Sequence, residues 1–282
     1  MRVLITGADG QLGLELQQAL KSETLIPLLW PAFDLLKPDA DAQILAAKPD
    51  IIIHAAAYTN VDKAEQEADV AMAVNADGTE RIAKAAEQVG ARLIYLSTDY
   101  VFDGTKGRPY IENDATNPLS VYGRSKRAGE ERALKYCRNT LVVRTAWLYS
   151  AHGSNFVKTI MRLARGEHAL RVVADQYGSP TLASDLAHVL TQLTPRPITG
   201  IIHATGSGES TWQEFAAEVV RLMGRSLPVH PITTQEANRL AKRPAYSVLS
   251  NGALTQAGLA LPHWKEALAL FMRSVEKEGQ TV

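Results

Sequence analysis

Short apolar runs alternate with longer amphipathic stretches through the first half of this chain of 282 residues. Short apolar runs predict buried strands, whereas apolar positions that recur three and four residues apart predict helices. Regular alternation of the two favours a parallel sheet with helices on both faces, so we predict a doubly wound α/β fold of Rossmann type. The predicted strands are Met1–Thr6, Thr24–Trp30, Ile51–His54, Ala91–Ser97 and Leu141–Trp147, and the predicted helices are Leu14–Leu20, Asp41–Lys48, Val61–Glu65, Val70–Val89 and a segment that starts at Pro118.

The pattern is less regular beyond about residue 150, where longer polar turns separate the elements. We predict a dinucleotide-binding domain over residues 1–150 and a smaller α/β substrate-binding lobe over residues 151–282, with segments near residues 170–205 returning to the sheet. The elements predicted here are the helices Asn155–Gly166, Ala183–Leu193, Thr211–Met223 and Trp264–Glu278, the strands Leu170–Val173 and Gly200–Ala204, the polar turn Asp175–Thr181 and the extended segment Arg243–Leu249.

Composition narrows the class of protein. Lys and Arg number 30 and Asp and Glu number 30, so the net charge is zero, and no basic block indicates nucleic acid or an anionic membrane surface. The single cysteine, Cys137, excludes an internal disulfide and a cysteine-based metal cluster. No apolar run approaches the length of a membrane span, and the first residues indicate a strand rather than a signal peptide. We expect a cytoplasmic protein without a membrane or nucleic-acid partner.

Three glycines separate the first predicted strand from the first predicted helix. Gly7, Gly10 and Gly13 form a G-x-x-G-x-x-G spacing. Glycine lets the backbone turn tightly and approach a pyrophosphate, which the unpaired N–H groups and the dipole of the helix N-terminus bind. The third glycine allows the helix to pack closely on the strand. An ordinary strand-to-helix turn is the alternative, but the place of the motif after an apolar strand favours a dinucleotide site.

Side chains that follow the second and third predicted strands leave two questions open. NAD-specific sites carry an acid near the end of the second strand and NADP sites an arginine, but here this strand ends in Leu28, Leu29 and Trp30. Asp34 either meets the adenine end of the cofactor or begins a turn, so the choice between NADH and NADPH stays open. His54 either acts as a base or packs at the end of its strand, and we favour packing.

Tyr122 and Lys126 lie four residues apart on a predicted helix and therefore share one face. We expect the ammonium to lower the pKa of the phenol from about 10, so that it exchanges a proton with a carbonyl oxygen near neutral pH. Ser97 and Thr98 end the fourth predicted strand, where a hydroxyl could bind the same oxygen; a turn or capping role is the alternative. A nicotinamide would carry the hydride.

These motifs resemble those of the extended short-chain dehydrogenase/reductase superfamily, and more closely those of the dTDP-4-dehydrorhamnose reductases. The resemblance runs from end to end of the chain, and the segments S-T-D-Y-V-F-D-G and D-Q-Y-G-x-P-T are much more specific than the glycines. The matching stretches are Thr6–Gly13, Ala55–Thr59, Val61–Glu65, Leu96–Gly104, Pro118 and Leu119, Val121–Gly123, Lys126, Ala128–Glu130, Arg144, Thr145 and Trp147, Asp175–Gly178, Pro180 and Thr181, and Arg243 and Pro244.

The resemblance implies NAD(P)H-dependent reduction of the C4 ketone of dTDP-4-dehydro-L-rhamnose, a step in the synthesis of a nucleotide sugar for cell-envelope polysaccharide. It implies Tyr122 as the proton donor, Lys126 as its partner and a ribose contact, and Thr98 as the third catalytic residue. The implied cofactor-binding residues are Gly7, Gly10, Gln11, Leu12, Gly13, Asp34, Leu35, Ala56, Ala57, Tyr58, Tyr122 and Lys126, and the implied sugar-nucleotide contacts are Thr98, Asp99, Trp147 and Arg243. Core packing is the alternative for Trp147, and a solvated loop charge is the alternative for Arg243.

One position departs from the pattern of the family. Some members form a Mg²⁺-linked dimer through glutamates, and Glu15 stands at one of these positions here. Ser184 stands where those members carry glutamate. This difference argues against the metal link, so we assign no metal-binding residue and leave a homodimer open.

Two other functions are compatible with the sequence. The first is a different reductase or an epimerase of the same superfamily, and an epimerase usually needs a second acid–base residue. The second is a non-catalytic regulatory subunit that has kept the fold, as in the β subunit of methionine adenosyltransferase. The presence of Thr98, Tyr122 and Lys126 together argues against the second.

Overall fold

The computed structural model describes residues 1–277, so the predicted end of the last helix at Glu278 lies outside the described residues. Its centre is a six-stranded parallel sheet in the order β10-β5-β4-β3-β1-β2. The strands are β1 (Arg2–Thr6), β2 (Thr24–Leu28), β3 (Ile51–His54), β4 (Arg92–Thr98), β5 (Thr140–Thr145) and β10 (Gly200–His203). The predicted doubly wound α/β fold is confirmed.

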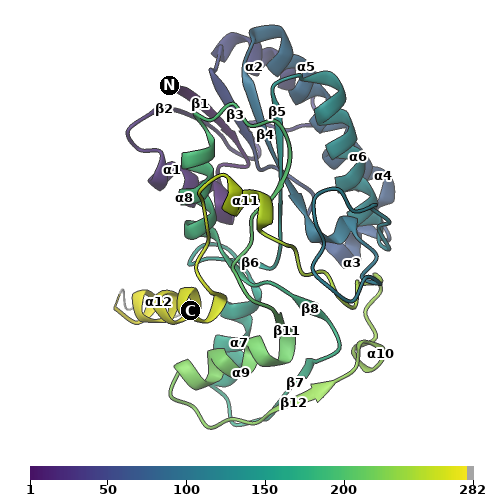
Figure 1. Cartoon of the computed structure of the whole chain (residues 1–282), viewed down its shortest axis with the longest axis vertical. Helices are drawn as coiled ribbons and strands as arrows, with labels where there is room; N and C mark the ends of the chain where they lie inside the picture. Colours follow the sequence, from purple (N-terminus) through teal and green to yellow (C-terminus); the bar gives the residue numbers. More distant parts are fainter. Residues whose placement is uncertain (278–282) are drawn as a thin grey trace.

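Helices cover both faces of this sheet (Figure 1). Successive side chains of a strand point to opposite faces, so Val3 and Ile5 pack in one core cluster and Leu4 packs in another. The first cluster includes residues of α1 (Gln11–Ala19) and α8 (Ala183–Leu193), and the second includes residues of α2 (Ala40–Ala47), α5 (Thr79–Val89) and α6 (Val121–Tyr136). Burial of both faces explains why the central strands are continuously apolar.

The strand order places a crevice near the glycine turn. From β1 the chain passes to β2 on one side and then returns to β3 on the other side of β1. Open parallel sheets bind ligands at such a reversal, outside the carboxyl ends of the strands. The Gly7–Gly13 turn follows β1, and residues 55–57 follow β3, so both segments lie at this edge.

A second layer of structure lies beyond the carboxyl edge of the sheet (Figure 1). A parallel pair of strands, β7 and β12, packs with three helices around an aromatic core that includes Tyr149, Phe215 and Phe271. Its elements are α7 (Phe156–Ala164), β7 (Leu170–Val173), α9 (Trp212–Leu222), β12 (Val229–Ile232) and α12 (Trp264–Lys277). Thr211 caps α9 in a capping box with Glu214. α8 and β10 follow β7 in the chain but belong to the sheet layer.

The predicted long helix over Val70–Val89 is interrupted in the structure. It consists of α4 (Ala68–Met72), a π-helical segment (Ala73–Gly78) and α5. The wider turn carries Asn75, whose amide accepts the backbone N–H of Tyr58 at 2.8 Å and donates to the Ser125 hydroxyl at 2.9 Å. Short π-helical turns are frequent at functional sites, and this one ties the segment after β3 to α6.

The hydrophobic pattern of the sequence did not predict several short elements. The polar turn predicted over Asp175–Thr181 contains two-residue strands that pair with other segments of the second layer. The helix predicted over Val61–Glu65 is present as α3 (Val61–Ala64). The short elements that the sequence did not predict are a 3₁₀ turn (Asp99–Val101), β6 (Leu148–Tyr149), β8 (Tyr177–Gly178), β9 (Thr181–Leu182), β11 (Ser210–Thr211), α10 (Thr234–Ala237) and α11 (Gly252–Gln256). Such strands are too short to show periodicity, because tertiary pairing rather than local preference forms them.

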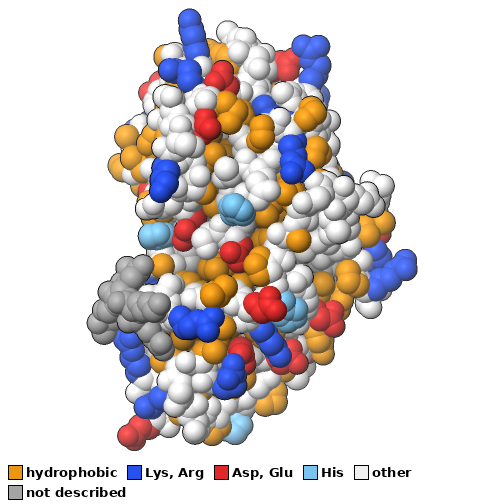
Figure 2. All heavy atoms as spheres, turned by 60° about the vertical axis from the view of Figure 1, so that its left-hand side comes forward, with side chains coloured by type: hydrophobic (Ala, Val, Ile, Leu, Met, Phe, Trp, Pro, Cys, Tyr) orange, Lys and Arg blue, Asp and Glu red, His pale blue; other side chains and the backbone are white. Residues whose placement is uncertain are grey.

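The surface agrees with the balanced charge of the sequence. Figure 2 shows Lys and Arg interspersed with Asp and Glu over the face that it presents. Within residues 1–277, no helix is both long and apolar enough to cross a membrane.

Candidate active site

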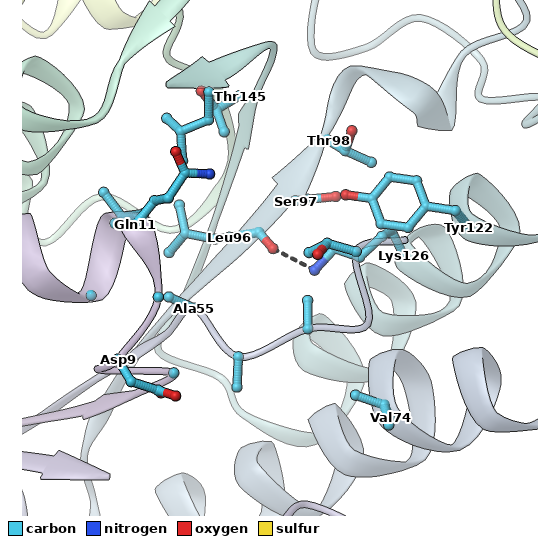
Figure 3. A pocket seen from close by; sticks show the side chains of 18 of the residues that line it. Asp9, Gln11, Ala55, Val74, Leu96, Ser97, Thr98, Tyr122, Lys126 and Thr145 are labelled. Atoms are coloured by element: carbon cyan, nitrogen blue, oxygen red, sulfur yellow. Dashed lines mark hydrogen bonds between the residues drawn. The ribbon is translucent and has the colours of Figure 1, made fainter. Parts of the chain in front are cut away.

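A cleft of about 740 Å³ lies at the carboxyl edge of the sheet, between the sheet and the second layer (Figure 3). It brings together most of the residues that the sequence singles out, from both halves of the chain. The predicted site residues that line it are Gly7, Gly10, Gln11, Leu12, Gly13, Asp34, Leu35, Ala56, Ala57, Thr98, Asp99, Tyr122, Lys126 and Trp147. Tyr58 and Arg243 are not among its lining residues.

Two glycines of the turn, Gly7 and Gly13, have no room for a side chain. Gly7 has φ +67°, and a Cβ there would lie 2.7 Å from the backbone N of Ala56. A Cβ at Gly13 would overlap the carbonyl oxygen of Gly7 and lie 2.6 Å from the Cα of Ala8. Gly10 precedes α1, and no side chain caps the first turn of this helix. Because no side chain caps the N–H groups at the start of α1, this turn fits the pyrophosphate of a dinucleotide.

Asp34 begins a turn, and its contact with the adenine end of the cofactor stays a prediction. Its carboxylate accepts the backbone N–H of Leu36 at 2.9 Å, so it begins a turn, and it also lines the cleft. Among the described residues that line the cleft, Lys126 is the one lysine or arginine. Neither an acid nor a basic residue follows β2 directly, so the side chains leave the choice between NADH and NADPH open.

His54 is a packed histidine. It is buried at the end of β3, where its Nδ1 lies 2.7 Å from the Thr6 hydroxyl and its Nε2 lies 3.1 Å from the Thr79 hydroxyl. Burial lowers its pKa to about 3, so the ring is neutral at physiological pH. It does not line the cleft, which agrees with the packing role that we favour.

The local structure around Tyr122 aims its side chain at the end of β4. The Ser120 hydroxyl caps α6, which places Tyr122 in the first turn. Gly123 lets this turn pack on the backbone of Tyr100, because a Cβ there would overlap the Tyr100 carbonyl oxygen. Figure 3 shows the phenol pointing toward Ser97 and Thr98. The phenol therefore stands beside the candidate hydroxyls.

The acidity of Tyr122 differs from the expectation. We predict from the sequence that the Lys126 ammonium lowers its pKa, but burial dominates and raises the pKa to about 12, with a hydrogen bond to Thr98 opposing the rise. Asp99 raises the pKa further when it is charged. In this chain the phenol is therefore protonated at neutral pH, as a proton donor must be.

Lys126 points into the cleft from the next turn of α6. Its Nζ donates a hydrogen bond of 2.6 Å to the carbonyl oxygen of Leu96, drawn as the dashed line in Figure 3, and lies 4.2 Å from the centre of the Tyr95 ring. Burial lowers its pKa to about 7, and Glu130 opposes this shift. Its ammonium is fixed one helical turn from the phenol.

Asp99 connects the end of β4 to a distant segment. Its carboxylate accepts hydrogen bonds from the hydroxyls of Thr98, at 3.0 Å, and Ser247, at 2.5 Å. Because it is buried, its pKa is raised to about 7. The two hydroxyl donors oppose this shift but do not cancel it.

This burial predicts a specific pH dependence of stability. Below pH 3.8 the Asp99 carboxyl is protonated in the folded and the unfolded chain; between pH 3.8 and about 7 only the unfolded chain has lost the proton. The free energy of unfolding should therefore fall as the pH rises through this window, by on the order of 4 kcal/mol for this group. The free energy of unfolding of wild type and of Asp99→Asn, measured by denaturant unfolding at several pH values, gives the contribution of the Asp99 carboxyl as the difference between the two proteins. A difference in stability that does not vary between pH 4 and 7 would contradict it.

Trp147 forms an aromatic wall with a residue that the sequence did not single out. Its ring is stacked on Trp212, with centroids 3.5 Å apart and planes at 7°. It has φ +46°, an uncommon conformation for a residue other than glycine. Both indoles line the cleft. Trp212 is the first residue of α9, directly after its capping residue Thr211.

Arg243 and Tyr58 have partners outside the cleft lining. The guanidinium of Arg243 binds Asp62 with contacts of 3.1 and 2.9 Å, and the hydroxyl of Tyr58 donates to Glu67 at 2.7 Å. Their assignment to ligand binding stays a prediction.

The residues considered for a metal link lie on neighbouring helices. Glu15 is on α1, with an oxygen 3.8 Å from the Nε2 of His152, and Ser184 is on α8. Burial raises the pKa of Glu15. In residues 1–277, no group of three or more His, Cys, Asp or Glu side chains is placed to hold a metal ion.

Known proteins resemble this chain over its full length. The family model described as RmlD substrate binding domain matches residues 1–277. A dTDP-4-dehydrorhamnose reductase of Sinorhizobium fredii is 42% identical over 294 residues, covering 99% of each protein. The spore coat polysaccharide biosynthesis protein SpsK of Bacillus subtilis is 40% identical over 275 residues, covering 96% of this chain and 97% of that protein. The crystal structure of a dTDP-4-dehydrorhamnose reductase of Bacillus anthracis in complex with NADP has a TM-score of 0.94 at 39% identity, covering 97% of this chain and 99% of that chain.

Proposed function

This chain belongs to the RmlD substrate-binding-domain family, and from this membership we propose that it is an NAD(P)H-dependent reductase of dTDP-4-dehydro-L-rhamnose. The observation that carries the proposal is the convergence of Tyr122, Lys126 and Thr98 on one cleft that the Gly7–Gly13 turn also lines. These segments are far apart in the sequence, and the fold alone brings them together.

The residues of the cleft support the following reaction. A nicotinamide cofactor held at the Gly7–Gly13 turn would supply the hydride that reduces the C4 carbon of the sugar. Tyr122 donates its phenolic proton to the C4 oxygen, so that the C=O group becomes CH–OH and the tyrosine becomes a phenolate. The Lys126 ammonium, one helical turn away, stabilises this phenolate. Thr98, whose hydroxyl lies at the same end of β4, orients the carbonyl oxygen.

The alternative functions have less support. An epimerase usually needs a second acid–base residue, and Asp99, the acid next to Thr98, is buried with its carboxylate bound to Thr98 and Ser247. A regulatory subunit without catalysis does not require Tyr122 and Lys126 to face a cleft. The reductase function therefore explains more of the residues in the cleft than either alternative does.

A direct assay tests the proposal. With dTDP-4-dehydro-L-rhamnose and either NADH or NADPH, we expect loss of nicotinamide absorbance and formation of one dTDP-L-rhamnose per nicotinamide oxidised. The same protein with UDP-glucose should release no epimer. Absence of nicotinamide oxidation with both cofactors, although the cofactor binds, would contradict the reductase and favour a regulatory role.

We also propose that the dTDP-sugar is the partner of this chain in the cytoplasm and that nucleic acid and membranes are not. A homodimer remains a proposal, which sedimentation with and without Mg²⁺ tests. Because Ser184 cannot supply a carboxylate, we expect the sedimentation coefficient to be the same under both conditions.

A further inference from the structure

A buried ion pair lies directly behind the cleft. Glu130 and Arg144 bind each other through two parallel contacts, from Arg144 Nε to Glu130 Oε1 at 2.8 Å and from Nη2 to Oε2 at 2.7 Å. Their side chains are only 4% and 3% exposed. Two charges buried in this way lose their hydration, which makes such a pair expensive unless its geometry is excellent and further hydrogen bonds satisfy it. A pair that serves only packing could be replaced by apolar side chains, so its position in the structure needs an explanation.

Glu130 shares a helix face with the two candidate catalytic residues. Tyr122, Lys126 and Glu130 follow one another at intervals of four residues on α6. Side chains at this spacing lie one above the other on a helix. The carboxylate of Glu130 is therefore the next group beyond the Lys126 ammonium, on the side away from the phenol.

Glu130 is also bound to the strand that ends at the cleft. The Ser97 hydroxyl donates a hydrogen bond of 2.5 Å to Glu130 Oε1. Ser97 lines the cleft and precedes Thr98. Arg144, the other partner of Glu130, pairs with Ser97 in the β4–β5 register and precedes Thr145, which also lines the cleft. One carboxylate therefore links α6, β4 and β5 at the points where each meets the site.

We propose that Glu130 is a positioning residue for the reaction, which ties the Ser97–Thr98 end of β4 to the catalytic helix and keeps the Lys126 ammonium charged. The role of Glu130 in catalysis rests on the proposed function. The effect of Glu130 on the charge of Lys126 involves only residues of this chain, so it can be measured without turnover.

The groups around Lys126 explain why this charge matters. On β3, His54 is neutral because its pKa is about 3, and on β4 the Tyr95 phenol is neutral because burial raises its pKa. Tyr122, on the same helix, is protonated at neutral pH. Burial lowers the pKa of Lys126 to about 7, and Glu130 is the charged group that raises it. Arg144, on β5, is the positively charged group bound to Glu130.

Glu130→Gln removes the charge while it keeps the shape and an acceptor for Ser97. We expect the pKa of Lys126, measured by NMR in protein labelled with ¹³C-lysine, to fall by at least about half a unit. The alkaline limb of the pH profile of kcat/KM should move to lower pH by the same amount. The matched control is Glu131→Gln, since Glu131 is 61% exposed and pairs with Arg127 at the surface. Glu131→Gln should change neither the pKa of Lys126 nor the alkaline limb of the pH profile.

Glu130→Gln leaves Arg144 buried without a counter-charge and could fail to fold. The double variant Glu130→Gln with Arg144→Met removes both charges and keeps the volume, so it tests the same point in a folded protein. A Lys126 pKa unchanged from wild type in whichever variant folds would overturn the proposal. Absence of turnover in the wild type would instead overturn the proposed function, and the NMR titration would still decide the role of Glu130.

Discussion

Replacing Tyr122 by phenylalanine is expected to lower kcat for the reduction by about 10²- to 10⁴-fold, the usual contribution of a positioned general acid. The substitution removes one oxygen atom and keeps the ring, which packs edge-on against Tyr100 with centroids 5.9 Å apart. The dissociation constant for the nicotinamide should change little, because the glycine turn and the residues after β3 are untouched. Stopped-flow measurement of kcat together with a fluorescence titration of the cofactor separates the two effects.

A second tyrosine of the same helix provides the control. Tyr136 ends α6 and is not among the residues that line the cleft. Tyr136→Phe should keep kcat within about twofold. Turnover of Tyr122→Phe at the wild-type rate would show that another group, or water, protonates the substrate.

Replacing Gly13 by alanine is expected to weaken cofactor binding by about 100-fold or more. The added methyl would overlap the Gly7 carbonyl oxygen and lie 2.6 Å from the Cα of Ala8. These are backbone atoms of the turn itself, so α1 must move away from β1, and a displacement of about 1 Å in a site can cost this much. Calorimetric titration with NADH and NADPH measures the loss.

Gly166→Ala is the matched control for Gly13→Ala. A Cβ at Gly166 meets only the Leu163 carbonyl oxygen, at 3.4 Å, which is an ordinary contact. Gly166 follows α7, away from the cleft, so its replacement should leave the dissociation constant unchanged. Wild-type affinity in Gly13→Ala would mean that the cofactor does not sit on this turn. Thermal unfolding of both variants shows whether lost affinity reflects a local or a global change.

Local patterns were sufficient for the sheet and for the centre of the site. The central strands are buried on both faces, so they appear in the sequence as unbroken apolar runs. The glycine turn and the Tyr122–Lys126 spacing are also local, because the first depends on backbone conformation and the second on the helical repeat. The place of Thr98 at the end of a predicted strand suggested that it meets the same oxygen as Tyr122, but a turn or capping role was equally compatible with that position, and the resemblance decided between them.

The remaining features depend on contacts between distant residues. Trp212 stacks on Trp147 across 65 positions, and Arg243 binds Asp62 across 181 positions. The π-helical turn at Asn75 forms where its amide reaches Tyr58 and Ser125, so helical periodicity could not show it. The pKa of Tyr122 was predicted with the wrong sign, because the spacing reveals the neighbouring ammonium but not the depth of burial.

The position of β10 has a consequence for synthesis on the ribosome. This strand pairs with β5, and α8, just before it, covers the sheet face on which Leu12 and Leu16 pack. A nascent chain that has not yet emerged through residue 203 therefore exposes an open strand edge and an uncovered apolar surface. Exposed edges and apolar faces of this kind recruit other chains. We expect a truncated product that stops after α7 to bind chaperones or aggregate, although it already contains the whole glycine turn and the Tyr122–Lys126 pair.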